Sequence, residues 1–378
     1  MQSLDRRRFL LTTAAAMPLT RLLRAQPRSE PGRIVRMTSP QNLETNFANL
    51  SGPITTTETF YIRNHFSAPK IVQSAWRLKV EGAIEHPLDL TLADVQKLGK
   101  DTRPITLECA GNGRVFLAPA AKGVNWQYGA VGTAEWTGVP LSALLEKAGV
   151  KKPAVEVILE GADSGIIADP ASPGPIHFAR SMPMEKATKP EVMLAWQMNG
   201  KDLLPPHGAP LRAIIGGWYG MASVKWLTRI IVSDKPFRGF FQSLDYSYFD
   251  RTHGLPSVKP ITGIQVKSQI AQPTLGDVVP ADKTVKVTGA AWAGEADVTK
   301  VDVSTDGGKH WEEASLVGDK NPFCWRLWEY EWKSPKAGKA VLMSRASDSK
   351  GRTQPMQRNP DFRAYMISHV LPVEIEVH

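Results

Sequence analysis

The sequence predicts an α+β protein with two domains, the second of which is an all-β sandwich. Its 378 residues are enough for two hydrophobic cores, and 42% hydrophobic with 22% charged residues is typical of a globular protein. Short strand and helix patterns alternate in the first two thirds of the chain, whereas only strand patterns follow residue 257. We therefore expect a mixed domain at residues 31–255 and a β-sandwich at residues 256–378.

The elements of the first domain are recognised from side-chain alternation and from the residues at their ends. Thr91, followed three residues later by an aspartate, predicts a capped helix start, and Gly149 stands where helices commonly end. Apolar and polar side chains alternate in the first expected strand, and the second is a short apolar run. The expected strands are 76–81 and 155–159, and the expected helices are 91–98 and 140–148.

The second domain is expected to contain at least four strands and one tight hairpin. The strands are predicted at 284–288, 300–304, 341–346 and 373–377. Asp306-Gly307-Gly308 predicts a hairpin turn, because glycine tolerates positive φ. Tryptophans at 311, 325, 328 and 332 fit either a ligand-stacking surface or core packing and subunit contact; the second is favoured, since aromatic side chains dominate cores and interfaces.

The N-terminus has the pattern of a twin-arginine export signal. Residues 5–10 read Asp-Arg-Arg-Arg-Phe-Leu, an alanine-rich apolar stretch follows, and Ala25 lies in a suitable cleavage region. The apolar stretch is about half as long as a membrane span requires. We expect residues 1–30 to be a signal peptide and linker, and the mature protein to be a periplasmic cofactor enzyme without a membrane span; a disordered basic tail is the alternative.

The formal net charge of +9 arises from lysines and arginines scattered among acidic residues. Nucleic-acid binding usually requires a basic block or stripe, which this pattern does not predict. An anionic substrate or an acidic protein partner fits the charge better.

Residues 106–114 read Thr-Leu-Glu-Cys-Ala-Gly-Asn-Gly-Arg, which places a thiol beside a glycine-rich turn and a guanidinium. A thiolate is a ligand for soft or high-valent metals, and arginine offers paired donors to oxyanions. The alternative is that Cys109 is a small buried apolar side chain and Arg114 a surface charge. The only other cysteine is Cys324; a bridge between the two is left open, although a reduced Cys109 is favoured.

Several common types of site are not predicted. The eight histidines show no zinc-ligand or His-Glu-x-x-His spacing, and Cys-x-x-Cys is missing. Neither a Walker nor a Rossmann glycine pattern follows a strand, and the serine-hydrolase elbow is absent. A metal at Cys109 would therefore need a cofactor to supply most of its ligands.

Six short motifs with polar side chains follow one another between residues 60 and 355. They are Arg63-Asn64-His65, residues 109–114, Lys122-Gly123 before Trp126, the stretch from His207 to Arg212, Val224-Lys225-Trp226-Leu227 and Thr305-Asp306-Gly307-Gly308. In this order they resemble the sulfite oxidase family of molybdenum enzymes. The resemblance implies a sulfite oxidase-type molybdopterin-binding domain, followed by an immunoglobulin-like β-sandwich dimerisation domain.

The resemblance also implies a molybdenum-molybdopterin cofactor and a set of site residues. Cys109 matches the protein ligand of the metal. The positions that hold the pterin and its phosphate match Asn64, His65, Asp163, His207, Arg212, Ser223 and Lys225. The catalytic positions match Cys109, the substrate-anion arginines Arg63 and Arg114, the active-site tyrosine Tyr246, and Trp126 as an aromatic wall.

The implied activity is oxidation of sulfite to sulfate by oxygen-atom transfer, with electrons passed singly to a c-type cytochrome or haem subunit. The chain has no Cys-x-x-Cys-His haem motif of its own. A homodimer is also implied. Two positions depart from the family pattern: Gly113 replaces an arginine of vertebrate members, and Asn321 occupies the place expected for a further substrate arginine, for which Lys320 or Arg326 would have to substitute.

Three other functions remain open from the sequence. Two are enzymatic: a sulfur dehydrogenase subunit of a thiosulfate-oxidising complex, and a sulfoxide reductase, although that group usually lacks the second domain. The third is a non-catalytic binding or scaffold protein that uses its β-sandwich as an interaction module.

Overall fold

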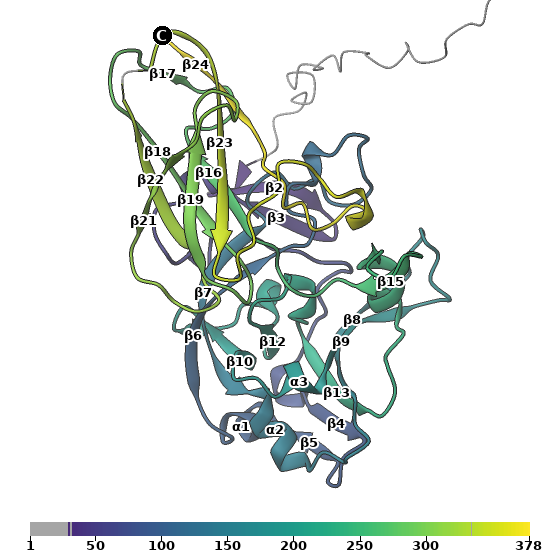
Figure 1. The fold of residues 1–378 in the computed structure, drawn as a ribbon. Coiled ribbons are helices and arrows are strands. Elements are labelled where there is room, and N and C mark those ends of the chain that lie inside the picture. The colour runs from purple at the N-terminus through teal and green to yellow at the C-terminus, as the bar shows by residue number, and fades with distance from the viewer. Residues whose placement is uncertain (1–28, 31, 334) are drawn as a thin grey trace, which may run out of the picture.

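The structure is a computed structural model that describes residues 29–30, 32–333 and 335–378. The expected signal peptide and linker lie outside the described residues except for Ser29 and Glu30. Within the part of the chain that is described, no helix is long and apolar enough to cross a bilayer. Figure 1 shows the two larger sheets and the short helices of the first domain below, the strand-rich second domain above them, and β2 and β3 of the first domain drawn at the height of the second. The predicted α+β class with a C-terminal sandwich is confirmed.

Two five-stranded sheets form the first domain. One has the order β11-β10-β7-β6, with β12 also paired to β10; the other has the order β5-β4-β13-β8-β9, in which only β13 and β4 are parallel. The first contains β6 (Asp101–Glu108), β7 (Val131–Pro140), β10 (Val192–Met198), β11 (Lys201–Asp202) and β12 (Arg212–Ile215). The second contains β4 (Leu78–Gly82), β5 (Leu88–Leu90), β8 (Glu156–Gly165), β9 (Ile176–Pro183) and β13 (Leu227–Ser233). A three-stranded sheet of β1 (Ser29–Glu30), β2 (Arg33–Thr38) and β3 (Gln41–Thr45) precedes them.

Three short α-helices connect these strands: α1 (Leu92–Gln96), α2 (Leu141–Ala148) and α3 (Met184–Ala187). The Thr91 side chain accepts a hydrogen bond from the Asp94 N–H, and the Asp94 carboxylate accepts one in return, so the predicted cap is present. Helix α2 ends at Gly149, which has a φ of 68°, a conformation that glycine adopts without strain. Both helix predictions are confirmed.

The apolar core joins the two sheets and α2. Its largest cluster includes Leu78 of β4, Leu144 of α2 and Leu194 of β10, all of them fully buried. A separate cluster contains Trp136 and Cys109. The thiol therefore stands beside tightly packed side chains, which limits the movement of the loop that follows it.

The second domain is a sandwich of two sheets with the orders β16-β18-β22-β21 and β17-β24-β23-β19-β20. The first contains β16 (Lys267–Gln272), β18 (Val285–Trp292), β21 (Ser315–Val317) and β22 (Arg326–Trp332). The second contains β17 (Val278–Val279), β19 (Val298–Ser304), β20 (Glu312–Glu313), β23 (Gly338–Asp348) and β24 (Val373–Val377). Gly307 and Gly308 have φ values of 76° and 90° in the turn between β19 and β20, as the hairpin prediction requires.

The tryptophans of this domain serve mainly as core residues. Trp328 is 1% exposed inside the sandwich, and Trp325 is 4% exposed within the core of the first domain. Trp311 and Trp332 are half-buried, and Trp311 lies under the Arg345 guanidinium at 4.2 Å. The interpretation as core residues is therefore confirmed for two of the four.

The domains are joined by more than one segment. The predicted boundary falls in the turn of the hairpin of β14 (Ser247–Asp250) and β15 (Ser257–Pro260). Two loops of the second domain reach back to the first, because the Phe323 carbonyl accepts from the Thr106 N–H and the Met366 N–H donates to the Ala110 carbonyl. The backbone around Cys109 thus contacts both domains.

Candidate active site

One pocket of the first domain collects most of the side chains that the sequence analysis selected. Ten of the twelve line it, and they come from the ends of β6 and β12, from β8 and from the loops between strands. The ten are Arg63, Asn64, His65, Cys109, Asp163, His207, Arg212, Ser223, Lys225 and Tyr246. Residues separated by more than 180 positions in the chain therefore meet at one place.

Cys109 lies directly after β6 and is 6% exposed. Its N–H donates to the Ala130 carbonyl at 2.8 Å, and its own carbonyl accepts from the Asn112 N–H at 2.9 Å. The side chain is buried, as the alternative interpretation expected, but it faces a pocket. Both cysteines are free, so the bridge left open above is not formed; burial raises the pKa of the Cys324 thiol to about 12.

Three cations of the lining lack a carboxylate partner among the described residues. The Arg212 guanidinium is 5% exposed and donates to the carbonyls of His207 at 3.0 Å and Ser223 at 3.1 Å. Lys225 donates to the Pro206 carbonyl at 2.9 Å and to the Asn64 side chain, and Arg63 donates to a backbone carbonyl. Burial, together with the Arg212 charge, lowers the pKa of Lys225. These three cations would therefore favour the binding of an anionic ligand with several oxygens.

Asp163 is the acidic group of this pocket. It is 4% exposed, and its Oδ1 atom has no hydrogen-bond partner. Burial raises its pKa to about 6, although the Lys225 charge opposes this shift. A buried acceptor without a partner is costly unless a ligand donates to it, and the ring N–H groups of a pterin are such donors. The lining therefore fits molybdopterin at both its phosphate and its pterin ring.

Tyr246 and His65 form a hydrogen-bonded pair at one side of the pocket, with 2.6 Å between the phenol oxygen and Nε2. Burial raises the pKa of Tyr246, and burial together with the Arg63 charge lowers the pKa of His65. Both side chains are thus neutral near pH 7. The His65 ring stacks on Phe178 with 4.4 Å between centroids, which fixes its orientation.

Arg114 and Trp126 are the two expected site residues that do not line the pocket. Arg114 is 5% exposed, donates to the Val124 carbonyl at 2.8 Å and lies 5.2 Å from the Tyr365 ring centre. Trp126 is fully buried, and its indole N–H has no partner. Since neither lines the pocket, their expected roles toward substrate stay predictions.

Sequence reasoning missed several residues around this pocket. Tyr61, Phe178 and Met221 line it, but each is one apolar or aromatic residue in an ordinary strand or loop pattern. Tyr365 donates to the Asp245 carboxylate at 2.5 Å, and its ring is 4.9 Å from that of Tyr246. Because Tyr365 reaches the site from a loop of the second domain, no local motif marks it.

Neither of the residues named as a replacement for a further substrate arginine lines the pocket, so such a role stays a prediction. Lys320 is exposed and pairs with Asp297 at 2.7 Å, and Arg326 donates to the Gly318 carbonyl at 3.1 Å. Asn321, at the aligned position, is exposed. All three follow a short strand on the outside of the sandwich, where alignment by sequence alone cannot place them against the site.

The buried histidines predict a loss of stability in acid. Burial, with the Lys225 charge, lowers the pKa of His207 to about 3, whereas an unfolded histidine titrates near 6.5. Between pH 6.5 and about pH 3 this histidine binds a proton in the unfolded chain but not in the folded chain. The free energy of unfolding therefore decreases as the pH is lowered through this range. At pH 5 the cost is about 2 kcal/mol for this residue.

The variant His207→Gln tests this expectation, since an amide can still donate to the Thr57 carbonyl that His207 contacts at 3.2 Å. Thermal unfolding at pH 7 and pH 5 should show a smaller loss of stability in the variant than in the unmodified protein. Equal losses in both proteins would contradict the assignment of a buried neutral His207.

Comparison with known proteins assigns both domains. Residues 65–241 match the model of an oxidoreductase molybdopterin binding domain, and residues 258–377 match a Mo-co oxidoreductase dimerisation domain. Sulfite oxidase of Gallus gallus is 34% identical over 348 residues, which cover 87% of this chain and 74% of that protein. A nitrate reductase [NADPH] of Aspergillus niger is 31% identical over 88% of this chain. The chain spans only 58% of mouse mitochondrial sulfite oxidase and 44% of the fungal enzyme.

A solved structure is similar over the whole chain. The sulfane dehydrogenase SoxCD from Paracoccus pantotrophus matches with a TM-score of 0.78 and 26% identity, covering 100% of this chain and 93% of the other. The pocket around Cys109 and the two matched domains lead to one conclusion. The chain belongs to the sulfite oxidase family of molybdopterin oxidoreductases, and its cofactor is molybdenum-molybdopterin.

Proposed function

We propose that this protein oxidises a small sulfur oxyanion, with sulfite as the first candidate, and passes the electrons to a separate c-type cytochrome or haem subunit. One observation is central to the proposal: one pocket is lined by a free cysteine and by three cations that have no carboxylate partner within residues 29–30, 32–333 and 335–378. The identity to proteins named sulfite oxidase supports the same substrate.

The side chains of the pocket divide into those that would hold the cofactor and those that would face the substrate. Cys109 would be the metal ligand, Asp163 would accept from the pterin ring, and Arg212 would bind the phosphate. The remaining donors near the pterin and its phosphate would be Asn64, His65, His207, Ser223 and Lys225. When bound, molybdenum-molybdopterin supplies two-electron oxygen-atom transfer and returns the electrons one at a time.

Arg63 and Tyr246 would act on the substrate itself. The Arg63 guanidinium is fixed in charge and lies at the pocket wall, where it would orient a dianion and offset its charge. Tyr246 keeps its proton near pH 7, so its hydroxyl would donate a hydrogen bond to a substrate oxygen when His65 carries its own proton on Nε2 and donates it to the phenol oxygen. The aromatic side chains around His65 exclude water from this side.

A sulfur dehydrogenase acting on another reduced sulfur species is the second candidate. The similarity to sulfane dehydrogenase SoxCD covers both domains of this chain. A sulfoxide reductase is less well supported, because the chain has the second domain that this group usually lacks. Family membership also favours an enzyme over the non-catalytic scaffold.

The test is steady-state reduction of ferricytochrome c by the holoenzyme with sulfite and thiosulfate, with sulfoxides and nitrate offered as oxidants to the reduced enzyme. We expect sulfite to give the highest kcat/KM. Preference for thiosulfate would replace sulfite with the second candidate, and turnover of sulfoxides or nitrate alone would refute oxidation of a sulfur oxyanion.

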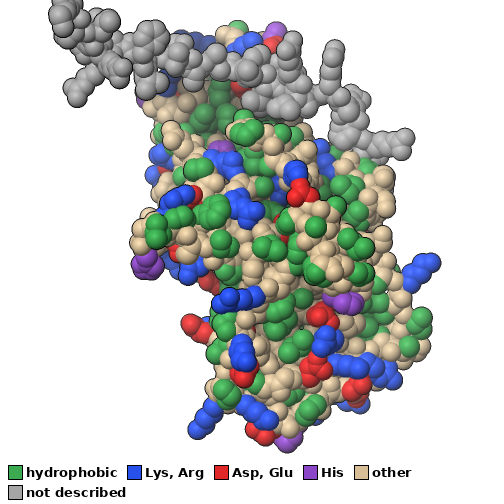
Figure 2. All heavy atoms as spheres, turned by 90° about the vertical axis from the view of Figure 1, so that its right-hand side faces the viewer, with side chains coloured by type: hydrophobic (Ala, Val, Ile, Leu, Met, Phe, Trp, Pro, Cys, Tyr) green, Lys and Arg blue, Asp and Glu red, His purple; other side chains and the backbone are tan. Residues whose placement is uncertain are grey.

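We also propose a periplasmic homodimer. The match to a dimerisation domain supports the dimer, and the twin-arginine pattern at residues 5–10 supports export. Figure 2 shows Lys and Arg side chains spread among apolar and acidic ones on the face it draws. The net charge of +9 would attract an acidic cytochrome. Sedimentation equilibrium tests the dimer, and the N-terminal sequence of protein recovered from the periplasm tests export.

A further inference from the structure

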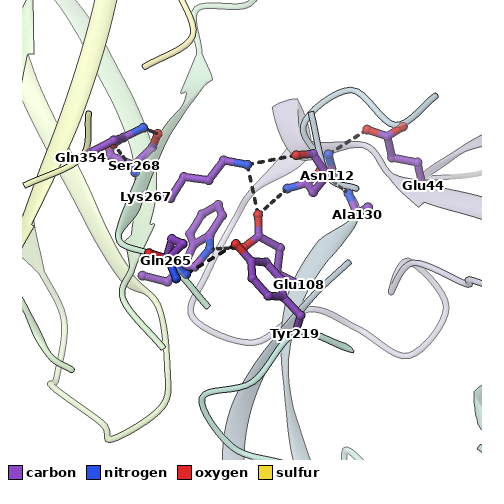
Figure 3. Close-up of polar contacts among 11 residues, drawn as sticks. Glu44, Glu108, Asn112, Ala130, Tyr219, Gln265, Lys267, Ser268 and Gln354 are labelled. Carbon is purple, nitrogen blue, oxygen red and sulfur yellow. Dashed lines mark hydrogen bonds and ion pairs between the residues drawn. The ribbon is translucent and has the colours of Figure 1, made fainter. Parts of the chain in front are cut away.

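Glu108 precedes Cys109 in the chain, and its carboxylate is held by side chains of the second domain (Figure 3). It is 2% exposed. The Lys267 ammonium donates to Oε1 at 3.0 Å, and the Trp292 indole donates to Oε2 at 2.8 Å. The residue next to the expected metal ligand therefore has both carboxylate oxygens bound from across the domain interface.

Lys267 also contacts the loop that follows Cys109. It is the first residue of β16, is 2% exposed, and its Nζ lies 3.3 Å from the Asn112 carbonyl oxygen. The Asn112 amide donates to Glu108 at 3.2 Å and accepts from the Ala130 N–H at 3.1 Å, as Figure 3 shows. Since Cys109 itself bonds to Ala130, these contacts close a ring around its backbone.

The charge of the Glu108 carboxylate also affects a side chain that lines the pocket. Burial raises the pKa of Tyr61, which lines the pocket, and the Cys109 and Glu108 groups add to that shift. Burial also raises the pKa of Tyr219, and the Glu108 and Cys109 groups add to that rise. The carboxylate and the thiol thus lie within electrostatic reach of the same two phenols.

A buried ion pair is a poor source of stability, because the desolvation of two charges offsets most of their attraction. The pair instead fixes the positions of the two side chains, because each buried charge is satisfied only where its partner lies. At this interface the pair links β16 of the second domain to the loop of the metal ligand.

We propose that Lys267 is a positioning residue for the molybdenum site, which it serves by fixing Glu108 and the loop after Cys109 from the second domain. The inference uses the family cofactor and does not depend on which sulfur compound is the substrate. It assigns the second domain a part in the geometry of the metal ligand.

The test compares the holoenzyme with the variant Lys267→Met. We expect the variant to bind molybdenum, to show an altered electron paramagnetic resonance spectrum of its one-electron-reduced metal, and to lose roughly 10–10²-fold in kcat, as removal of an outer contact of a metal ligand typically does. The KM should change little, because Lys267 does not line the pocket.

Lys186→Met is the matched control. Lys186 is 7% exposed and pairs with Glu295 of the second domain at 2.6 Å, so it also crosses the domain interface. Its other polar contacts among the described residues are Glu191 and the Gly216 carbonyl, which lie outside the Cys109 loop. It should leave the spectrum unchanged. Equal spectral changes in both variants would mean general loosening of the interface, and would overturn the proposal, as would an unchanged spectrum in Lys267→Met.

The double variant Glu108→Gln with Lys267→Met covers the case in which the single variant fails to fold. It removes both charges, so no buried charge is left without a partner. We expect it to fold and to keep the altered spectrum and reduced kcat. A double variant with the original spectrum and kcat would overturn the proposal, whereas unmodified protein without molybdenum would refute the cofactor assignment instead.

Discussion

Replacement of Cys109 with serine is expected to abolish sulfite oxidation while the fold persists. The side chain lies in the pocket, forms no disulfide and is similar in volume to serine, so packing changes little. A serine hydroxyl does not ionise near pH 7 and is a poor ligand for a soft metal. We expect a loss greater than the roughly 10²–10³-fold that removal of one transition-state hydrogen bond costs, measured as sulfite-dependent reduction of ferricytochrome c.

Cys324→Ser is the control for this variant. Cys324 is half-buried outside the pocket, and its thiol donates to the Pro104 carbonyl at 3.0 Å, a bond that a serine hydroxyl can replace. It should retain activity. Circular dichroism and thermal unfolding would show that both variants are folded, and sulfite turnover by a folded Cys109→Ser variant at the rate of the unmodified protein would refute the role of Cys109.

The second large effect is expected from Arg212→Met, which should yield protein depleted of cofactor. Arg212 is fully charged at neutral pH and has no carboxylate partner among the described residues, so its charge is free to bind a phosphate. A charge-assisted hydrogen bond contributes about 1.5–3 kcal/mol, which is roughly a 10–10²-fold change in affinity for each bond lost. Molybdenum per chain, measured after gel filtration, reports the result.

The matched control is Arg229→Met on β13, because Arg229 is 41% exposed and pairs with Glu81 and Glu160 at the surface. Exposed pairs of this kind contribute at most about 1 kcal/mol to stability. The control should keep its molybdenum. Full retention of molybdenum by Arg212→Met would exclude Arg212 from the phosphate site.

The features that the sequence predicted correctly depend on neighbours in the chain. The cap at Thr91, the end of α2 at Gly149 and the turn at Gly307 each require a conformation or contact within a few residues. Most of the pocket was also found, because its residues occur in short motifs at strand ends, such as the loop that starts at Cys109.

The features that were missed depend on contacts between distant segments. Glu108 and Lys267 are 159 residues apart, and a lysine at the start of a strand looks like an ordinary surface charge until the domains pack. Tyr365 and Arg114 meet only because a loop of the sandwich returns to the first domain. The surroundings of Arg114 therefore depend on the position of that loop.

That returning loop affects the order of events during biosynthesis. The Ala364 carbonyl accepts from Arg114 at 3.3 Å, the Met366 N–H bonds to Ala110, and Ile367 and Leu371 lie against Gly113. These residues leave the ribosome after every strand of the first domain. A nascent chain that has completed only its first domain therefore lacks the contacts that these residues make with the Cys109 loop.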